Sequence, residues 1–432
     1  MRRTGAARPC VRRLRHAWRV PPPRGALTAA LLLAATSLGI AACATSPQRS
    51  AAPTTSRAAR TTTTTTTSAA SAPSSSEPPA SSTTSPAPVE APGSACVTAP
   101  ARWAPAEVAE QVLMVIGSFT SVGSLAPEAS AGVGGFVLLG EPPARSGPAL
   151  RAALGALGAD AADSGAVVPW MSTDTEGGPV SRLADVLGQL PSARQMAAQW
   201  TPSQVESAMQ ARGAALRHLG ITMDLAPVLD TAEPTDPVAD ESQRSFSATP
   251  GVAAAYGAAF AAGLRASGVV AVGKHFPGLG HASANTDTGP ATDPPLAQLR
   301  AGDILAFTRA VASGIPVVMV GHPMVPGLSD GLPASLSPAT YSLLRTTVHF
   351  GGVAMTDALG AGAISAAGYF EAGAAVAALR AGADMAMVDA STWQPVAQAL
   401  VQALSNGGLS RANLDASVGR ILAAKGLSVC AA

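Results

Sequence analysis

GVVAVGKHFPG, residues 268–278, contains the pattern that decides the fold of this chain. A short apolar run comes first, and Lys274 and His275 follow it directly. A continuous apolar run of this length is typical of a parallel strand that is covered on both faces. Lys274 is one of only two lysines in the chain, the other being Lys425. A lysine and a histidine at the end of a buried strand therefore indicate a functional position.

The same pattern returns along the chain, with helical stretches between the apolar runs. Thr201 to Leu219, Leu296 to Ser313 and Glu371 to Ala381 are predicted helices, and Ser337-Pro338 opens another. Regular alternation of strands and helices predicts a parallel sheet, and seven or eight units favour a single (β/α)8 TIM-type barrel. The segment VLMVIG (112–117) fits either an eighth strand or the end of a helix. The other predicted strands are 132–140, 165–174, 220–230, 315–323, 351–359 and 383–389.

Polar residues stand at the C-terminal ends of these predicted strands. In a barrel all such ends meet at one face, where the active site is built. We therefore expect one site that contains the following strand-end residues: Asp174, Glu176, Asp230, Lys274, His275, His322, Asp357 and Asp389.

The composition excludes several other functions. The sequence has no HExxH, no Cys/His metal spacing, no Gly-x-Ser-x-Gly and no GxGxxG after an early strand. Carboxylates, a lysine, arginines and histidines remain, and they suit carbohydrate chemistry without a metal or organic cofactor. The net charge is +1 and no basic stripe is present, so we expect no nucleic-acid partner.

The N-terminal part differs from the rest of the chain. Residues 1–24 contain eight arginines and no acidic residue, and a short apolar run follows. This pattern is typical of a signal peptide, here residues 1–42, and it ends in a sequence resembling a lipobox before Cys43. We expect an exported protein, anchored by lipid on Cys43 at the extracytoplasmic face of the cell membrane; an ordinary signal peptide is the alternative. Residues 43–95, rich in Ser, Thr, Ala and Pro, are predicted to be a disordered tether.

The remaining residues, 96–432, form the predicted catalytic domain. Two cysteines, Cys96 and Cys430, lie at its two ends. In an exported protein such a pair indicates a disulfide, which would join the termini of a closed barrel. Two free thiols are the alternative.

Five sequence blocks in this domain resemble glycoside hydrolase family 3, in particular its bacterial β-N-acetylglucosaminidase (NagZ-type) branch. They occur in the family's order, and PASLSP (333–338) also fits. The resemblance covers about residues 100–425. It implies a single-domain retaining hydrolase that removes terminal β-linked N-acetylglucosamine (GlcNAc) from cell-wall fragments. The blocks are STDTEGGPVSRL (172–183), ITMDLAPVLD (221–230), QRSFS (243–247), KHFPGLG (274–280) and MTDAL (355–359).

The resemblance also assigns roles to individual residues. Asp357 matches the catalytic nucleophile, which would form a covalent glycosyl-enzyme. The matching sugar-binding residues are Asp174, Arg182, Arg244, Lys274 and His275.

The general acid/base is where this chain departs from the family pattern. NagZ-type enzymes have Asp-Ser-His in the loop after the Lys-His pair, and this chain has Asn285-Thr286-Asp287. Three readings remain open. Asp287 replaces the histidine, or His281 reaches in from the same loop, or the remaining case holds, in which the acid comes from elsewhere or hydrolysis is weak.

These readings lead to three functional hypotheses. The first is a β-N-acetylglucosaminidase for peptidoglycan-derived glycans. The second is a β-glucosidase or β-xylosidase of the same family, and the third is a glycan-binding lipoprotein with little hydrolysis. A monomer is expected in each case.

Overall fold

The computed structural model describes residues 96–236 and 243–430. The predicted signal peptide (1–42), the lipid site at Cys43 and the tether (43–95) lie outside the described residues. No helix within 96–236 or 243–430 is long and apolar enough to cross a membrane.

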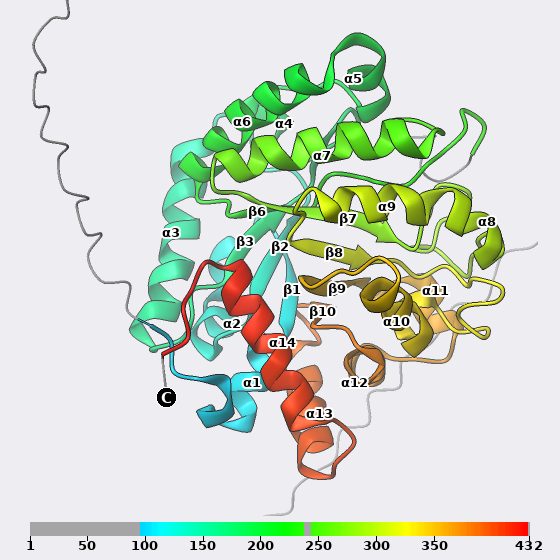
Figure 1. The fold of residues 1–432 in the computed structure, drawn as a ribbon. Coiled ribbons are helices and arrows are strands. Elements are labelled where there is room, and N and C mark those ends of the chain that lie inside the picture. The colour runs from blue at the N-terminus through cyan, green and yellow to red at the C-terminus, as the bar shows by residue number, and fades with distance from the viewer. Residues whose placement is uncertain (1–95, 237–242, 431–432) are drawn as a thin grey trace, which may run out of the picture. The chain divides into compact units, whose positions relative to one another are not determined.

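Eight parallel strands close into a barrel, which confirms the predicted fold class (Figure 1). The ambiguous segment VLMVIG contains the eighth strand: β1 (Leu113–Ser118) pairs with β2 on one side and with β10 on the other, and so closes the barrel. The order around the barrel is β1-β10-β9-β8-β7-β6-β3-β2. The remaining strands are β2 (Gly135–Leu139), β3 (Trp170–Thr173), β6 (Met223–Asp224), β7 (Val270–Phe276), β8 (Val317–Val320), β9 (Val353–Ala358) and β10 (Met385–Asp389).

Strand β6 is much shorter than the predicted strand 220–230. Pro227 lies in its path and has no N–H to donate to a neighbouring strand. Pairing continues beyond β6 as separate hydrogen bonds, in which Lys274 donates its N–H to the Pro227 carbonyl and accepts the N–H of Leu229 (3.1 and 2.7 Å). The segment after β6 is therefore held firmly against β7 although it is not a regular strand.

Helices surround the barrel, and three of the four predicted helices are single helices that begin where the sequence predicts, namely α6, α10 and α12. Helix α6 begins after Thr201, whose side chain accepts the N–H of Gln204, and ends at Gly220 in the left-handed conformation. The other helices are α1 (Pro105–Gln111), α2 (Ala126–Ala131), α3 (Gly147–Asp163), α4 (Ala184–Leu187), α5 (Ala193–Gln199), α7 (Pro250–Ala266), α10 (Pro338–Thr346), α11 (Gly362–Ala366), α12 (Glu371–Ala381), α13 (Trp393–Ser405) and α14 (Arg411–Ala424), with α6 spanning Pro202–Leu219.

The single helix predicted over 296–313 is wrong. The structure has two helices there, α8 (Leu296–Ala301) and α9 (Asp303–Ala312), which are separated at Gly302. The break turns the buried carboxylate of Asp303 inward, where it accepts the N–H of Thr231 at 2.7 Å. The chain thus interrupts the helix at Gly302 and forms a hydrogen bond between Asp303 and the loop after β6.

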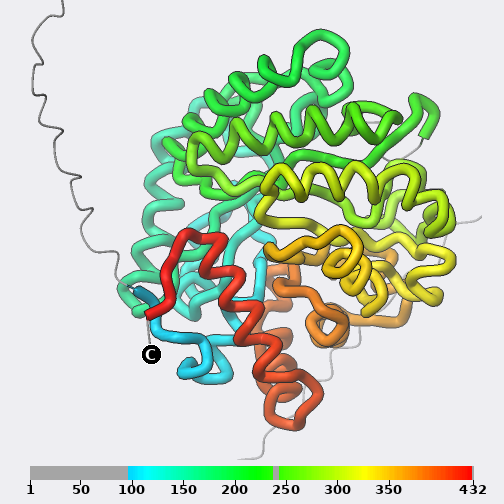
Figure 2. Tube along the Cα trace, in the orientation of Figure 1, coloured from blue at the N-terminus to red at the C-terminus, as the bar shows by residue number. Residues whose placement is uncertain are grey.

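A disulfide joins Cys96 to Cys430, with their Cα atoms 4.8 Å apart. Val97 and Val429 pair beside it as a short parallel bridge. Figure 2 shows the first described residues, in blue, next to the last ones, in red. Both ends of the described domain are therefore fastened together.

Candidate active site

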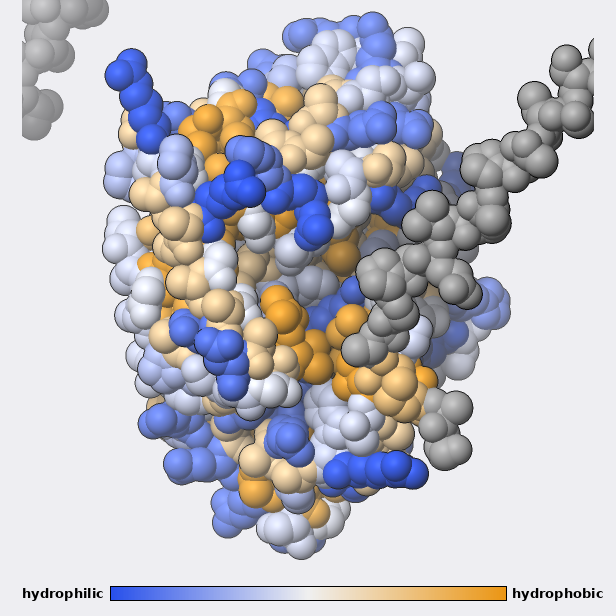
Figure 3. Space-filling model, turned by 90° about the vertical axis from the view of Figure 1, so that its left-hand side faces the viewer, coloured by the Kyte–Doolittle hydropathy of each residue, from blue (hydrophilic) through white to orange (hydrophobic). Residues whose placement is uncertain are grey.

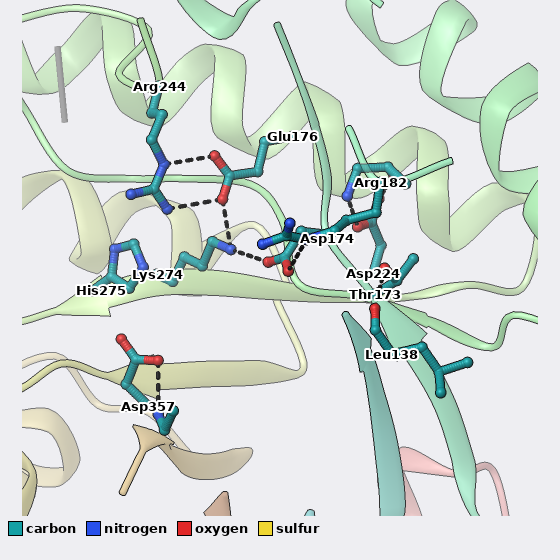
Figure 4. A network of polar contacts seen from close by, with 12 residues as sticks. Leu138, Thr173, Asp174, Glu176, Arg182, Asp224, Arg244, Lys274, His275 and Asp357 are labelled. Carbon is teal, nitrogen blue, oxygen red and sulfur yellow. Dashed lines mark hydrogen bonds and ion pairs between the residues drawn. The ribbon is translucent and has the colours of Figure 1, made fainter. Parts of the chain in front are cut away.

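A buried network of four charged side chains lies at the C-terminal ends of β3 and β7. Lys274 is 2% exposed, and its Nζ lies 2.7 Å from Asp174 Oδ1 and 2.7 Å from Glu176 Oε1. Arg244 donates from Nε and Nη2 to the two oxygens of Glu176 (2.8 and 2.9 Å). Figure 4 shows the chain of contacts from Arg244 through Glu176 and Lys274 to Asp174. The network arranges alternating charges across the mouth of the barrel.

The network holds Glu176 and Lys274 in their charged forms. Burial alone would raise the pKa of Glu176, but Arg244 and Lys274 outweigh it and hold that pKa well below its usual range. Burial would likewise lower the pKa of Lys274, but the carboxylates of Asp174 and Glu176 raise it. Each buried charge thus has an opposite partner, as a charge removed from water requires.

Sequence reasoning gave Glu176 no specific role, although the structure places it at the centre of this network. Glu176 belongs to β4 (Thr175–Gly177), which forms a small hairpin with β5 (Val180–Ser181). A signal was present in the sequence, because Asp174 and Glu176 are two residues apart and an extended chain directs such residues to the same face. Arg182 follows the hairpin, and its Nε lies 3.7 Å from Asp174 Oδ2.

His275 is fixed by Asp230, the strand-end residue of the preceding unit. Its Nδ1 lies 2.8 Å from Asp230 Oδ2, and its backbone N–H donates to Asp230 Oδ1 at 3.0 Å. The same Oδ1 accepts the N–H of Leu279 at 3.0 Å. Asp230 therefore orients the imidazole and also anchors the start of the loop after β7.

Asp357, at the end of β9, faces the strand that carries Lys274 and His275 (Figure 4). Its Oδ1 accepts the N–H of Ala358 at 2.8 Å. Burial opposes ionisation of this carboxyl, but His275, His322 and the Ala358 N–H outweigh burial and lower its pKa. Asp357 is thus ionised near neutral pH, as a nucleophilic carboxylate must be.

His322 is buried and contacts the residue that follows Asp357. Its Nε2 is 2.9 Å from the Ala358 carbonyl oxygen, so this nitrogen carries the proton and donates, while Nδ1 pairs with the Ser335 hydroxyl at 2.7 Å. Burial lowers the pKa of His322. Its contacts support the backbone that presents Asp357.

The loop after β7 contains Asp287 and rests on the segment that follows Asp357. The carbonyl groups of Asp287 and Thr286 accept the N–H groups of Gly362 and Ala363 (2.8 and 3.0 Å). Asp287 is exposed, and its charge acts to raise the pKa of His322, so it lies within electrostatic reach of the site. The structure thereby brings Asp287 to the same face as Asp357.

His281 is engaged elsewhere in the same loop. Its Nδ1 lies 2.8 Å from Asp236 Oδ2, on the loop after β6. Asp389 is also engaged outside the network, because its backbone N–H donates to Glu371 on α12 at 3.2 Å and its side chain contacts that of Glu371. Of the predicted strand-end residues, Asp389 is therefore the one that the structure ties to a helix rather than to Lys274 or Asp357.

Asp224, at the end of β6, is fully buried. It is expected to make the stability of the folded protein depend on pH. Burial raises its pKa to about 7 in spite of the hydrogen bonds from Thr175. A raised pKa means that the folded state holds the proton more tightly than the unfolded state. The resulting stabilisation is present below about pH 4 and is lost as the pH rises toward 7.

We therefore expect the free energy of unfolding of the wild type to fall between pH 5 and pH 8. In Asp224→Asn this fall should be smaller by about 2 kcal/mol. Denaturant unfolding at the two pH values measures this difference. Asp163→Asn, at an exposed position of α3, is the matched control and should leave the loss unchanged. Equal losses in wild type and Asp224→Asn would contradict the prediction.

No group of three or more His, Cys, Asp or Glu side chains that could hold a metal ion occurs in the described part of the chain.

Comparison with known proteins identifies the family. The model of the glycosyl hydrolase family 3 N-terminal domain matches residues 129–424. The chain belongs to glycoside hydrolase family 3. It is therefore a glycoside hydrolase by family, and the resemblance that the sequence blocks indicated is confirmed.

Individual family 3 relatives cover most of the domain. Beta-hexosaminidase LpqI of Mycobacterium tuberculosis is 40% identical over 280 residues, which are 63% of this chain and 72% of that protein. A family 3 glycosyl hydrolase structure from Mycobacterium smegmatis matches with a TM-score of 0.69 and 38% identity, covering 76% of this chain and 98% of its own. The beta-N-acetylhexosaminidase structure from Beutenbergia cavernae gives 0.70 and 29%, covering 76% and 100%.

Proposed function

We propose that this family 3 protein is a retaining β-N-acetylglucosaminidase that removes terminal β-linked GlcNAc through a covalent intermediate on Asp357. The ionised carboxylate of Asp357, opposite Lys274 and His275 at the mouth of the barrel, carries the proposal. Relatives named beta-hexosaminidase and beta-N-acetylhexosaminidase support the choice of sugar.

In the first step, Asp357 attacks the anomeric carbon while a general acid protonates the leaving oxygen. We propose Asp287 for that acid, because its loop rests on the segment after Asp357. Asp287 then acts as base and removes a proton from the water that hydrolyses the glycosyl ester, which releases the sugar with its original configuration. His281, whose Nδ1 pairs with Asp236, remains the alternative acid from the same loop.

The sugar-binding residues differ in how far their polar groups are already engaged, and not simply in exposure, since the Arg244 side chain is 18% exposed. Arg182 and Asp174 retain exposed side-chain surface (37% and 12%) and can contact sugar hydroxyls directly. Lys274 pairs with two carboxylates. Arg244 Nε and Nη2 both donate to Glu176. We therefore propose that Arg244 mainly positions Glu176 and Lys274, while Asp174, Arg182, Lys274 and His275 orient the sugar.

The proposed location is the outer side of the cell membrane. A signal peptide over 1–42, lipid on Cys43 and a tether over 43–95 would attach the catalytic domain 96–432 to the membrane. The Cys96–Cys430 disulfide supports export, because such bonds persist in oxidising compartments. Peptidoglycan-derived glycans are the substrates that this location would supply.

Hydrolysis rates of three aryl β-glycosides test the proposed specificity. We expect the aryl N-acetylglucosaminide to be cleaved at least about tenfold faster, as kcat/KM, than the glucoside or the xyloside. A site that binds the acetamide group loses those contacts with a sugar that lacks it. Faster cleavage of the glucoside or xyloside would show a different member of the family. Calorimetry showing GlcNAc binding without turnover of any aryl substrate would show a binding protein instead.

A further inference from the structure

A large cavity in the described part of the protein lies at the opposite end of the barrel from Asp357. It has a volume of about 1340 Å³ and is lined by the first and last described segments, the starts of β3 and β7, and the ends of α6, α7 and α14. Figure 3 looks at the end of the barrel where the strands begin and shows apolar residues, in orange, around a hollow. The proposed hydrolysis uses nothing at this end.

The cavity has mainly apolar walls and an excess of positive charge. Val167, Val168 and Leu427 contribute to the walls, and Val168 is 52% exposed at the rim. Among the described residues, Glu107 is the single acidic residue of the lining, whereas the cationic residues there are Arg102, Arg217, Arg265 and Lys425. Apolar walls with a few placed polar groups are typical of small-molecule sites.

Lys425, the second of the two lysines, is held in this cavity by a few contacts. Its Nζ donates to the Val168 carbonyl at 3.0 Å and lies 5.3 Å from the centre of the Trp170 ring. Burial lowers its pKa to about 7. An ammonium group has three donors, so an anionic acceptor would give Lys425 the charged partner that it lacks among these contacts.

We propose that this cavity binds an amphiphile with an anionic head group, such as an acyl-chain carboxylate. The head group pairs with Lys425, and the chain lies along the walls formed by Val167, Val168 and Leu427. The cavity exceeds the usual size of small-molecule pockets, roughly 300–1,000 Å³, so it has room for an acyl chain. This site is separate from hydrolysis and does not depend on the identity of the sugar.

Titration of the purified protein with decanoate tests the proposal, with tryptophan fluorescence and calorimetry as readouts. We expect saturable binding of one decanoate per protein and at least about tenfold weaker binding of 1-decanol, which has the same chain without the charge. Vesicles of phosphatidylglycerol present an anionic head group within a bilayer. A response to decanoate identifies a free amphiphile, and a response to vesicles alone identifies a membrane lipid.

Three variants locate the binding. Lys425→Met and Val168→Asp should each weaken decanoate binding at least about tenfold and leave aryl glycoside hydrolysis unchanged. Arg300→Met removes an exposed cation on α8, outside the cavity, and should bind normally. Val168 is at the rim, so its variant keeps the test valid if Lys425→Met does not fold. The proposal is overturned if neither decanoate nor the vesicles show saturable binding. It is also overturned if 1-decanol binds as tightly as decanoate and neither Lys425→Met nor Val168→Asp weakens binding.

Discussion

Asp357→Asn is expected to lower the rate of aryl β-N-acetylglucosaminide hydrolysis by about four orders of magnitude or more. The amide keeps the size of the side chain, and its oxygen can still accept the Ala358 N–H. It cannot supply the anionic oxygen that forms the glycosyl ester. The loss should therefore appear in kcat, whereas thermal unfolding should change little.

Asp389→Asn is the matched control for this variant. Asp389 also ends a barrel strand, but its side chain contacts that of Glu371 on α12. We expect its activity to stay within about tenfold of wild type, since surface or structural substitutions outside the reacting centre act mainly on stability.

A small nucleophile gives a sharper test of the same residue. In Asp357→Ala, azide can enter the vacated space and attack the anomeric carbon, expelling the aryl alcohol and forming an α-glycosyl azide. Azide should then restore aryl release in Asp357→Ala and leave wild type unaffected. Activity of Asp357→Asn above about a tenth of wild type, with no rescue of Asp357→Ala, would remove Asp357 from the nucleophile's role.

The strand ends could be predicted because they obey a local rule. Parallel strands in a barrel are buried on both faces, so their apolar runs stand out, and the first charged residue after each run marks the mouth. Lys274 and Asp357 are found in this way. Helix ends such as Thr201 and Gly220 carry equally local capping signals.

Features that depend on distant partners could not be predicted in this way. Gly302 divides a helical pattern because Asp303 turns inward to the N–H of Thr231, a residue 72 positions away. Asp293 follows the same logic. It is 3% exposed, and burial together with Asp303 and Asp230 raises its pKa well above the usual range, although nothing beside it in the sequence indicates burial.

Glu176 shows the limit most clearly for the site. Its spacing from Asp174 is visible in the sequence, but its partners Lys274 and Arg244 come from different segments, 98 and 68 residues later. Only closure of the barrel brings the four charges together. The position of Glu176 near a strand end can be read from the local sequence. Its contacts with Lys274 and Arg244 depend on how the whole barrel folds.

Asp287→Ala is expected to separate two substrates that differ only in their leaving group. Cleavage of a β-linked GlcNAc disaccharide should fall by about 10² to 10³, because a sugar hydroxyl is a poor leaving group and needs protonation. An activated aryl alcohol leaves without that proton, so the glycosylation step of the aryl substrate should fall by less than about tenfold. Single-turnover measurements of both substrates give this comparison.

His281→Ala is the matched control within the same loop. His281 pairs with Asp236, so its loss should affect both substrates alike if it only supports the loop. A selective loss on the disaccharide in His281→Ala, with no such loss in Asp287→Ala, would transfer the acid's role to His281. A selective loss in neither variant would mean that the proton comes from outside this loop. The two variants together therefore decide whether a carboxylate has replaced the histidine that the NagZ-type pattern places at position 287.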